Sequence, residues 1–181
     1  MRILFVLLIG SLLTSCVDLE KSAQTEKIEA MNTTLDSIEN VLNENVFDSL
    51  SSIQVNSYDV ESRIKKHYVS DTINIELGRK MDAFKKMRKS LAPLGKARRA
   101  IESGIEEERI SLKELLSDIE GSNGERAKYD ENILYEKAKV NQLVALLTDY
   151  VLTKASASDT YEQHYEDLNE FSLNLLPKNQ E

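Results

Sequence analysis

A regular spacing of apolar residues near the start of the chain limits its fold more than any other feature. Ten steps over 36 residues give 3.6 residues per step, the period of a straight α-helix. We predict one long amphipathic helix over about residues 27–66, weakest at 54–57, where polar and β-branched residues lower the helix propensity. Its inward positions are Ile28, Met31, Leu35, Ile38, Leu42, Val46, Leu50, Ile53, Val60 and Ile64, with Ser57 at the one polar position.

A second amphipathic helix is predicted over about residues 71–120. Residues 67–70 interrupt the apolar pattern of the first helix. Asp71 is the predicted N-cap of the second helix. Pro93 interrupts the helix, but the apolar phase continues unshifted, which favours a kink over a hairpin. The predicted inward positions are Ile73, Leu77, Met81, Phe84, Met87, Leu91, Leu94, Ile101, Ile105, Leu112, Leu115 and Ile119.

A third helix is predicted over about residues 125–176. The stretch 121–124, Gly-Ser-Asn-Gly, is the clearest turn signal in the chain. Small polar residues at 156–158 weaken the helix, but the phase survives them, which favours continuity, and Pro177 ends it. The predicted inward positions are Tyr129, Ile133, Val140, Leu143, Leu147, Tyr150 or Val151, Tyr161, Tyr165, Leu168, Phe171 and Leu175.

Three long helices joined by two short turns predict an all-α fold. Helices of about 45 to 50 residues, running up, down and up, would form an elongated antiparallel three-helix bundle about 70 Å long. The single bundle would occupy residues 27–176 and leave residues 177–181 as a tail. Long amphipathic, coiled-coil-like helices in this order resemble a spectrin-like bundle in architecture only, because no sequence motif of that family is present.

The first sixteen residues carry a different pattern. Arg2 precedes an apolar run over residues 3–13, and the small residues Thr14 and Ser15 lead into Cys16, the only cysteine. The run would span about 16 Å, too short for a hydrocarbon layer of about 30 Å, so it reads as a signal peptide. Leu13-Thr14-Ser15-Cys16 resembles the lipobox of bacterial lipoproteins.

The lipobox resemblance implies how the chain is processed and where it is located. Residues 1–15 would be removed, and Cys16 would become a lipidated N-terminus followed by a flexible tether over residues 16–26. The membrane is then a partner through this lipid. We expect a bacterial cell-envelope location, in the outer membrane, because Val17 rather than Asp follows the cysteine. Val17 to Lys21 also resembles an acidic surface-export leader, so the leaflet stays open.

A dense basic segment lies in the second predicted helix. Between Arg79 and Arg99 stand nine basic residues and one acid, Asp82: Arg79, Lys80, Lys85, Lys86, Arg88, Lys89, Lys96, Arg98 and Arg99. One interpretation is a site for an anionic envelope ligand. The other, which we favour, is charge matching between helices. Pairing across the two turns would set the segment opposite seven acids: Glu44, Asp48, Asp59, Asp149, Asp159, Glu162 and Glu166.

The sequence offers no residues for catalysis. It holds no phosphate-binding glycine loop, and no nucleophile motif accompanies its serines. His67 and His164 lack the spacing of known metal motifs, so we expect neither a metal nor a cofactor. The run 106–108, three glutamates, is read as a solvated helix face.

These observations favour a binding role over an enzyme. The net charge of -8 gives no general attraction to nucleic acid, so none is expected as a partner. We expect a non-catalytic envelope lipoprotein that serves as a helical spacer or docks another envelope protein. The alternative is a binder of an anionic ligand through the basic segment. The sequence leaves the oligomeric state open.

Overall fold

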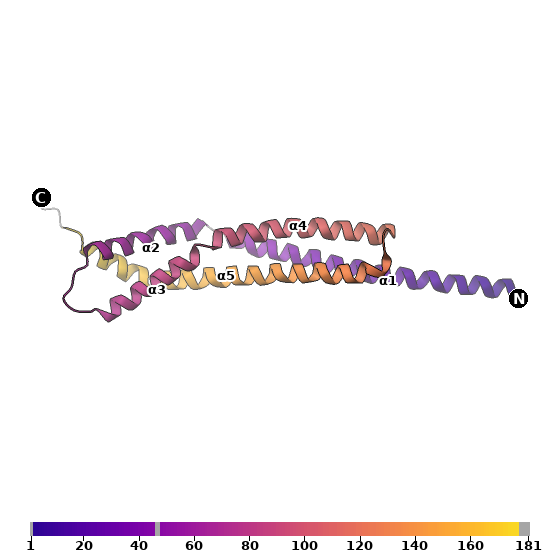
Figure 1. Ribbon diagram of the computed structural model, residues 1–181, viewed down its shortest axis with the longest axis horizontal. Coiled ribbons are helices and arrows are strands. Elements are labelled where there is room, and N and C mark those ends of the chain that lie inside the picture. The colour runs from indigo at the N-terminus through magenta and orange to yellow at the C-terminus, as the bar shows by residue number, and fades with distance from the viewer. Residues whose placement is uncertain (1, 46–47, 178–181) are drawn as a thin grey trace. The chain divides into compact units, whose positions relative to one another are not determined.

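The computed structural model describes residues 2–45 and 48–177, with side chains at 19–45 and 50–177. All the regular secondary structure in these residues is helical, with no strand among them, which confirms the predicted all-α class. The helices are α1 (Arg2–Glu44), α2 (Asp48–His67), α3 (Ile75–Leu91), α4 (Leu94–Gly121) and α5 (Tyr129–Asn174), with a 3₁₀ turn at Arg126–Lys128 before α5 (Figure 1). No described helix combines the length and apolar character needed to cross a bilayer.

The chain divides into two compact units, each of packed helices. Unit 1 contains α1 up to Val41, α4 from Ile101 and α5 up to Ala145. Its core is filled by the predicted apolar positions of all three helices. The buried residues include Ile28, Met31, Leu35, Ile38, Ile101, Ile105, Leu112, Ile119, Tyr129, Ile133, Val140 and Leu143.

Contacts between the helices of unit 1 fix their directions. Lys21 of α1 donates to the carbonyl of Glu120 at the end of α4, and Asp36 later in α1 pairs at 2.6 Å with Arg109 earlier in α4, so these two helices run antiparallel. Lys27 pairs with Asp130 at 3.2 Å, which places the start of α5 beside this part of α1. Gln24 is buried as well. The expected flexible tether is therefore part of α1 wherever its side chains are described.

Unit 2 contains Leu42–Ala100 and the chain from Leu146 onward. Its core also follows the predicted stripes: Leu42, Leu50, Val60, Ile64, Phe84, Met87, Leu91, Leu94, Leu147, Tyr150 and Leu168 are buried. Ser57, the polar member of the first stripe, is fully buried among them, and the small polar stretch near Ala157 does not interrupt α5. The favoured continuity of the third helix is confirmed.

The first predicted helix is divided in two, since α1 ends at Glu44 and α2 begins at Asp48. The end of α1 exposes carbonyls with no partner inside the helix. Arg98 Nη1 donates to the carbonyl oxygens of Leu42 at 2.7 Å and Asn45 at 3.1 Å, and the Tyr150 hydroxyl donates to the Asn45 carbonyl at 3.2 Å. Side chains distant in sequence therefore stabilise the end of α1. The apolar spacing continues through this point, so it gives no sign that the helix ends there.

The start of the second predicted helix also differs from expectation. The N-cap is Asn74, whose Oδ1 accepts from the Leu77 amide at 3.0 Å, and not Asp71. Residues 68–74 form a loop, and Ile73, predicted to face the core, is 90% exposed. The cap places the helix start two positions beyond the first residue of the apolar stripe.

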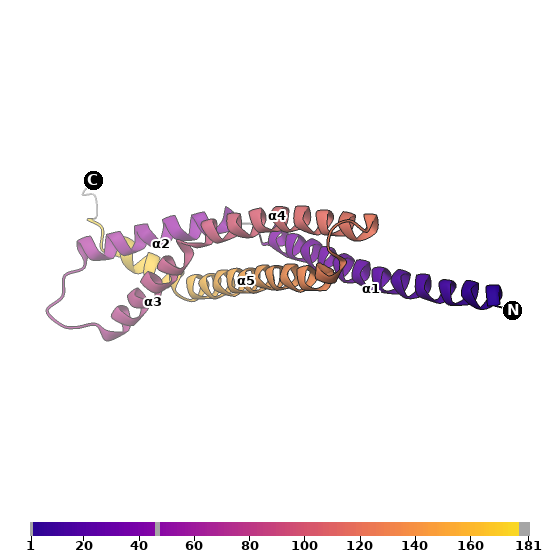
Figure 2. The ribbon, with the colours of Figure 1, turned by 45° about the vertical axis from the view of Figure 1, so that its right-hand side comes forward.

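Pro93 separates α3 from α4 without reversing the chain. Ala92, which follows α3, keeps right-handed helical angles, and the Pro93 carbonyl accepts from the amides of Lys96 and Ala97 at 3.0 and 2.9 Å. Proline cannot donate to the preceding turn, so one continuous helix becomes two segments. The chain bends there, as the uninterrupted phase predicts, and makes no hairpin (Figures 1 and 2).

Candidate binding surfaces

The nine residues of the basic segment have different surroundings. Two of them reach another helix as ion pairs: Arg88 contacts Glu61 of α2, and Lys80 contacts Asp167 of α5 at 2.9 Å. Arg98 holds the end of α1, and Lys86 pairs at 2.8 Å with Asp82 one turn away on its own helix. Among the nine residues, only these four form an ion pair or a side-chain hydrogen bond with another described residue.

Glu61 is the best-enclosed partner of the segment. Its side chain is 2% exposed, and it accepts from Arg88 Nε and Nη2 and from Lys65 Nζ at 3.0 to 3.3 Å. Burial alone would raise the pKa of Glu61, but the hydrogen bonds from Arg88 and Lys65 outweigh it and lower the pKa. The carboxylate therefore stays charged and fixes α3 against α2.

The acids predicted to face the segment are not the ones it contacts. The side chain of Asp48 lies outside the described residues, and the other six (Glu44, Asp59, Asp149, Asp159, Glu162 and Glu166) form no ion pair within the described part. The positions of the two turns determine which residues of neighbouring helices lie at the same height along the bundle axis. The helical period determines whether each of these residues points toward the neighbouring helix or toward solvent. Most of these acids lie on outward faces, which explains why they form no ion pair with the segment among the described residues. The two inter-helix pairs that the segment does form, Arg88–Glu61 and Lys80–Asp167, use other acids.

The remaining five basic residues are exposed: Arg79, Lys85, Lys89, Lys96 and Arg99. None makes an ion pair with a described side chain. With Lys86, which is 75% exposed despite its contact with Asp82, they give the outward side of α3 and the start of α4 a strong positive charge. We call the exposed residues Arg79, Lys85, Lys86 and Lys89 of α3 the basic face.

An aliphatic surface lies beside the basic face. Val69 and Ile73 in the 68–74 loop are both 90% exposed, and Ile75 at the start of α3 is 66% exposed. The loop is held at both ends, because Tyr68 packs its ring 5.6 Å from that of Phe171 and Asn74 caps α3. We call Val69, Ile73 and Ile75 the aliphatic tip.

Unit 1 contains a buried charged cluster that the sequence reading missed. Glu108, expected on a solvated face, is 4% exposed. Its Oε1 lies 2.5 Å from Lys139 Nζ, and Lys139 also contacts Glu136 at 2.9 Å. Burial and the nearby Glu136 raise the pKa of Glu108 against the effect of Lys139. Burial would lower the pKa of Lys139, but its bonds to the two carboxylates raise it.

A signal for this cluster exists in the sequence. Glu108 stands three residues after Ile105 and four before Leu112, so it occupies a position of the apolar stripe. One charged residue at such a position needs a partner on the facing helix, because an unpaired buried charge is costly. The cluster fixes α4 against α5.

The two histidines do not form a metal site in the described structure. His67 and His164 are half-buried, and no group of three or more metal-ligating side chains occurs among the described residues. A cavity of about 380 Å³ lies between the start of α3 and the end of α5, lined by both polar and apolar side chains, Lys80 and Asp167 among them. Lys80 is already engaged there by Asp167 and Glu76.

The side chain of Cys16, the predicted lipidation site, lies outside the described residues. Comparisons of the chain with protein-family models, curated proteins and solved structures find no match.

Proposed function

We propose that this chain is a non-catalytic lipoprotein of the bacterial cell envelope, anchored by lipid at Cys16. Its helical body would act as a spacer or docking module for another envelope component. The observation that carries the docking role is the pair of exposed surfaces on α3 and the preceding loop, the basic face and the aliphatic tip. The lipobox supports the anchor, because it gives the lone cysteine a role that needs no second thiol.

Intact-mass analysis of the membrane fraction tests the anchor. The mature chain should begin at Cys16 and carry a diacylglyceryl adduct, and Cys16→Ala should leave the chain uncut or unanchored. A soluble wild-type protein that begins at another residue would contradict the proposal. A pull-down from the native envelope that depends on the lipid would then identify the docking partner.

A second candidate function is the binding of an anionic envelope ligand. The basic face favours it, since Arg79, Lys85 and Lys89 form no ion pair with a described side chain that would explain their charge. Reversing Lys85 and Lys89 to Glu should weaken retention of the ligand while helix content and melting temperature stay unchanged. A fall in melting temperature that shrinks in high salt would instead favour the charge-matching interpretation.

The continuous register of the three apolar stripes supports a finer proposal for the fold. We propose that the three predicted helices form one elongated antiparallel three-helix bundle of spectrin-like architecture. Cysteines at Val69 and Asn174 should then react with a short crosslinker, whereas a pair at Val69 and Ser122 should not. The reverse pattern would rule out this arrangement.

A further inference from the structure

The aliphatic tip is unusual for a loop between two helices. Residues 68–74 contain neither glycine nor proline, the residues that most often form such connections. Instead the loop closes through Ser70, whose Oγ donates to the Thr72 carbonyl at 2.9 Å and accepts from the Thr72 amide at 3.2 Å. Val69 and Ile73 flank this closed turn and are almost fully exposed.

The position of the tip makes it accessible. In both ribbon views the segment between α2 and α3 projects beyond the ends of these two helices (Figures 1 and 2). The contacts of Tyr68 with Phe171 and of Asn74 with the Leu77 amide hold the two ends of the loop in place. Three exposed aliphatic side chains in one short segment mark an interaction surface.

The basic face lies on the same side of α3 as the last residue of the tip. From Ile75, the exposed residues Arg79, Lys86 and Lys89 follow at four, eleven and fourteen positions, which is one face of an α-helix. Asp82 is also on this face and is paired with Lys86. If α3 lies along a surface, it presents an aliphatic end and a row of positive charges together.

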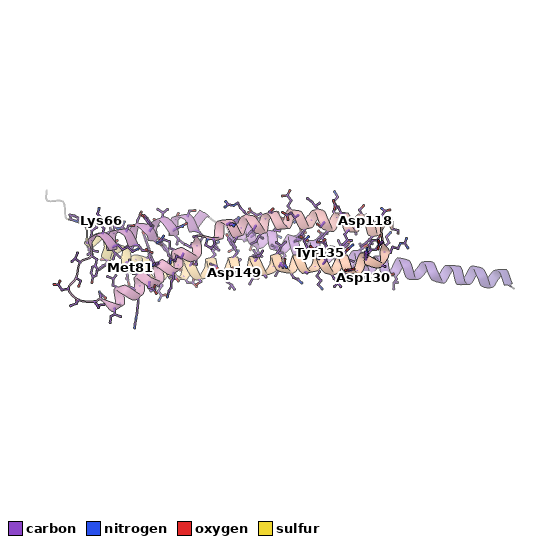
Figure 3. All side chains as sticks on the ribbon, viewed as in Figure 1. Lys66, Met81, Asp118, Asp130, Tyr135 and Asp149 are labelled. Atoms are coloured by element: carbon purple, nitrogen blue, oxygen red, sulfur yellow. The ribbon has the colours of Figure 1, made fainter. Side chains whose placement is uncertain are left out.

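The charge of the whole α2–α3 hairpin contrasts with that of the chain. Residues 48–91, which make up α2, the loop and α3, hold nine basic and six acidic residues, a net charge of +3, whereas the chain carries -8. Lys66 stands at the loop end of α2 (Figure 3). The acids near the tip are Asp71 in the loop, Glu76, and the α5 residues Asp167 and Glu170, which line the same cavity as Asn74. Lys80 pairs with both Glu76 and Asp167. The region that carries the tip is therefore suited to an anionic partner.

We propose that the tip of the α2–α3 hairpin docks on an anionic lipid surface. Val69, Ile73 and Ile75 enter the boundary between headgroups and acyl chains, and the basic face lies against the headgroups. The proposal rests on the second candidate function and names its ligand. An anionic polysaccharide or nucleic acid offers no hydrocarbon layer to receive these side chains, and the tip exposes no aromatic ring for stacking on bases.

The test uses the full chain with a fluorescent label in the loop. The mature protein is incorporated into phosphatidylcholine vesicles and labelled at Thr72→Cys, or at Gln163→Cys on the exposed side of α5 as a control. Vesicles containing about one-third phosphatidylglycerol and a lipid-borne quencher are then added. We expect quenching at position 72, none at position 163, and none with neutral quencher vesicles.

Two pairs of variants separate the contributions of charge and hydrocarbon. Val69→Ser with Ile73→Ser, and separately Lys85→Glu with Lys89→Glu, should each raise the amount of anionic lipid needed for half-maximal quenching about tenfold. The matched controls are Leu152→Ser, an aliphatic residue exposed elsewhere in unit 2, and Lys113→Glu with Lys137→Glu. Neither control should change the quenching curve, and circular dichroism checks that every variant is folded.

The outcomes have distinct meanings. If position 72 is not quenched, or is quenched equally by neutral vesicles, the lipid proposal is overturned, and a protein partner for the tip takes its place. If the loop stays unquenched but Lys85→Glu with Lys89→Glu still weakens retention of an anionic envelope ligand, anionic-ligand binding survives without lipid docking. If the chain does not remain with the carrier vesicles, the Cys16 anchor fails, and the loop label is then read on the free chain with the same expected result.

Discussion

Lys139 should make the largest single electrostatic contribution to unit 1, and Lys139→Met tests this. The substitution keeps most of the side-chain volume but leaves Glu108, with a side chain 5% exposed, and Glu136, at 14%, without their shared cation. Removing one partner of a fully buried pair costs about 3 to 5 kcal/mol. Because Lys139 is itself 32% exposed, we expect about 2 to 3 kcal/mol, a fall of about 5 to 10 °C in melting temperature for a chain of this size.

Urea unfolding at neutral pH measures this loss, and Lys137→Met is the matched control. Lys137 is an exposed lysine two residues earlier on α5 and has no ion pair with a described side chain, so its replacement should change stability by less than about 0.5 kcal/mol. Adding Glu108→Gln to Lys139→Met should recover part of the loss, because the uncompensated buried charge disappears. Equal stability of the two lysine variants would refute the reasoning.

The pH dependence of Lys139→Met gives a second check. In the wild type the pKa of Glu108 is already above its ordinary value of 4.5 because of burial and Glu136, and loss of Lys139 raises it further. A carboxyl group with a raised folded-state pKa binds its proton more tightly when folded, so its contribution is complete below pH 4.5 and is lost as the pH rises through the folded-state pKa. The defect should therefore be small in mild acid and grow toward neutral pH.

Three further substitutions have defined outcomes in thermal or urea unfolding. Arg98→Met should cost about 1 to 3 kcal/mol, because two carbonyls at the end of α1 lose a charged donor, whereas Arg99→Met, exposed beside it, should be nearly neutral. Glu61→Gln should flatten the acid limb of the stability curve: the folded pKa of Glu61 is lowered, so its contribution is present above 4.5 and is lost as the pH falls through the lowered value. Tyr161→Phe should cost about 0.5 to 1.5 kcal/mol, since it removes the hydrogen bond from Asn56 but keeps the ring.

The core of this protein could be predicted from its sequence because burial follows the helical period. The first stripe places even Ser57 correctly, although serine gives no apolar signal of its own. Ile73 shows where the method fails. It fits the phase of Leu77 and Met81, but the cap at Asn74 starts the helix after it, and a local hydrogen bond cannot be read from apolar spacing.

The candidate surfaces were less predictable, for a geometric reason. The positions of the turns place the basic segment at the height of several acids. The acids that the segment contacts on other helices are Glu61, which is buried, and Asp167, and neither was among the predicted acids. The break after Glu44 likewise depends on Arg98 and Tyr150, which are far away in sequence. Sequence periodicity describes one helix at a time, whereas these features depend on which faces of two helices meet.

The aromatic residues give the two units different optical properties. The chain has no tryptophan, so its near-ultraviolet signal comes mainly from tyrosine. In unit 2 the Tyr161 ring lies 4.4 Å from Tyr165 and 6.1 Å from Phe84, stacked on both. Of the seven tyrosines, unit 1 holds only Tyr129 and Tyr135. Near-ultraviolet circular dichroism should therefore follow the packing of unit 2, while far-ultraviolet circular dichroism follows the helices of both, and divergence between the two would reveal units that melt separately.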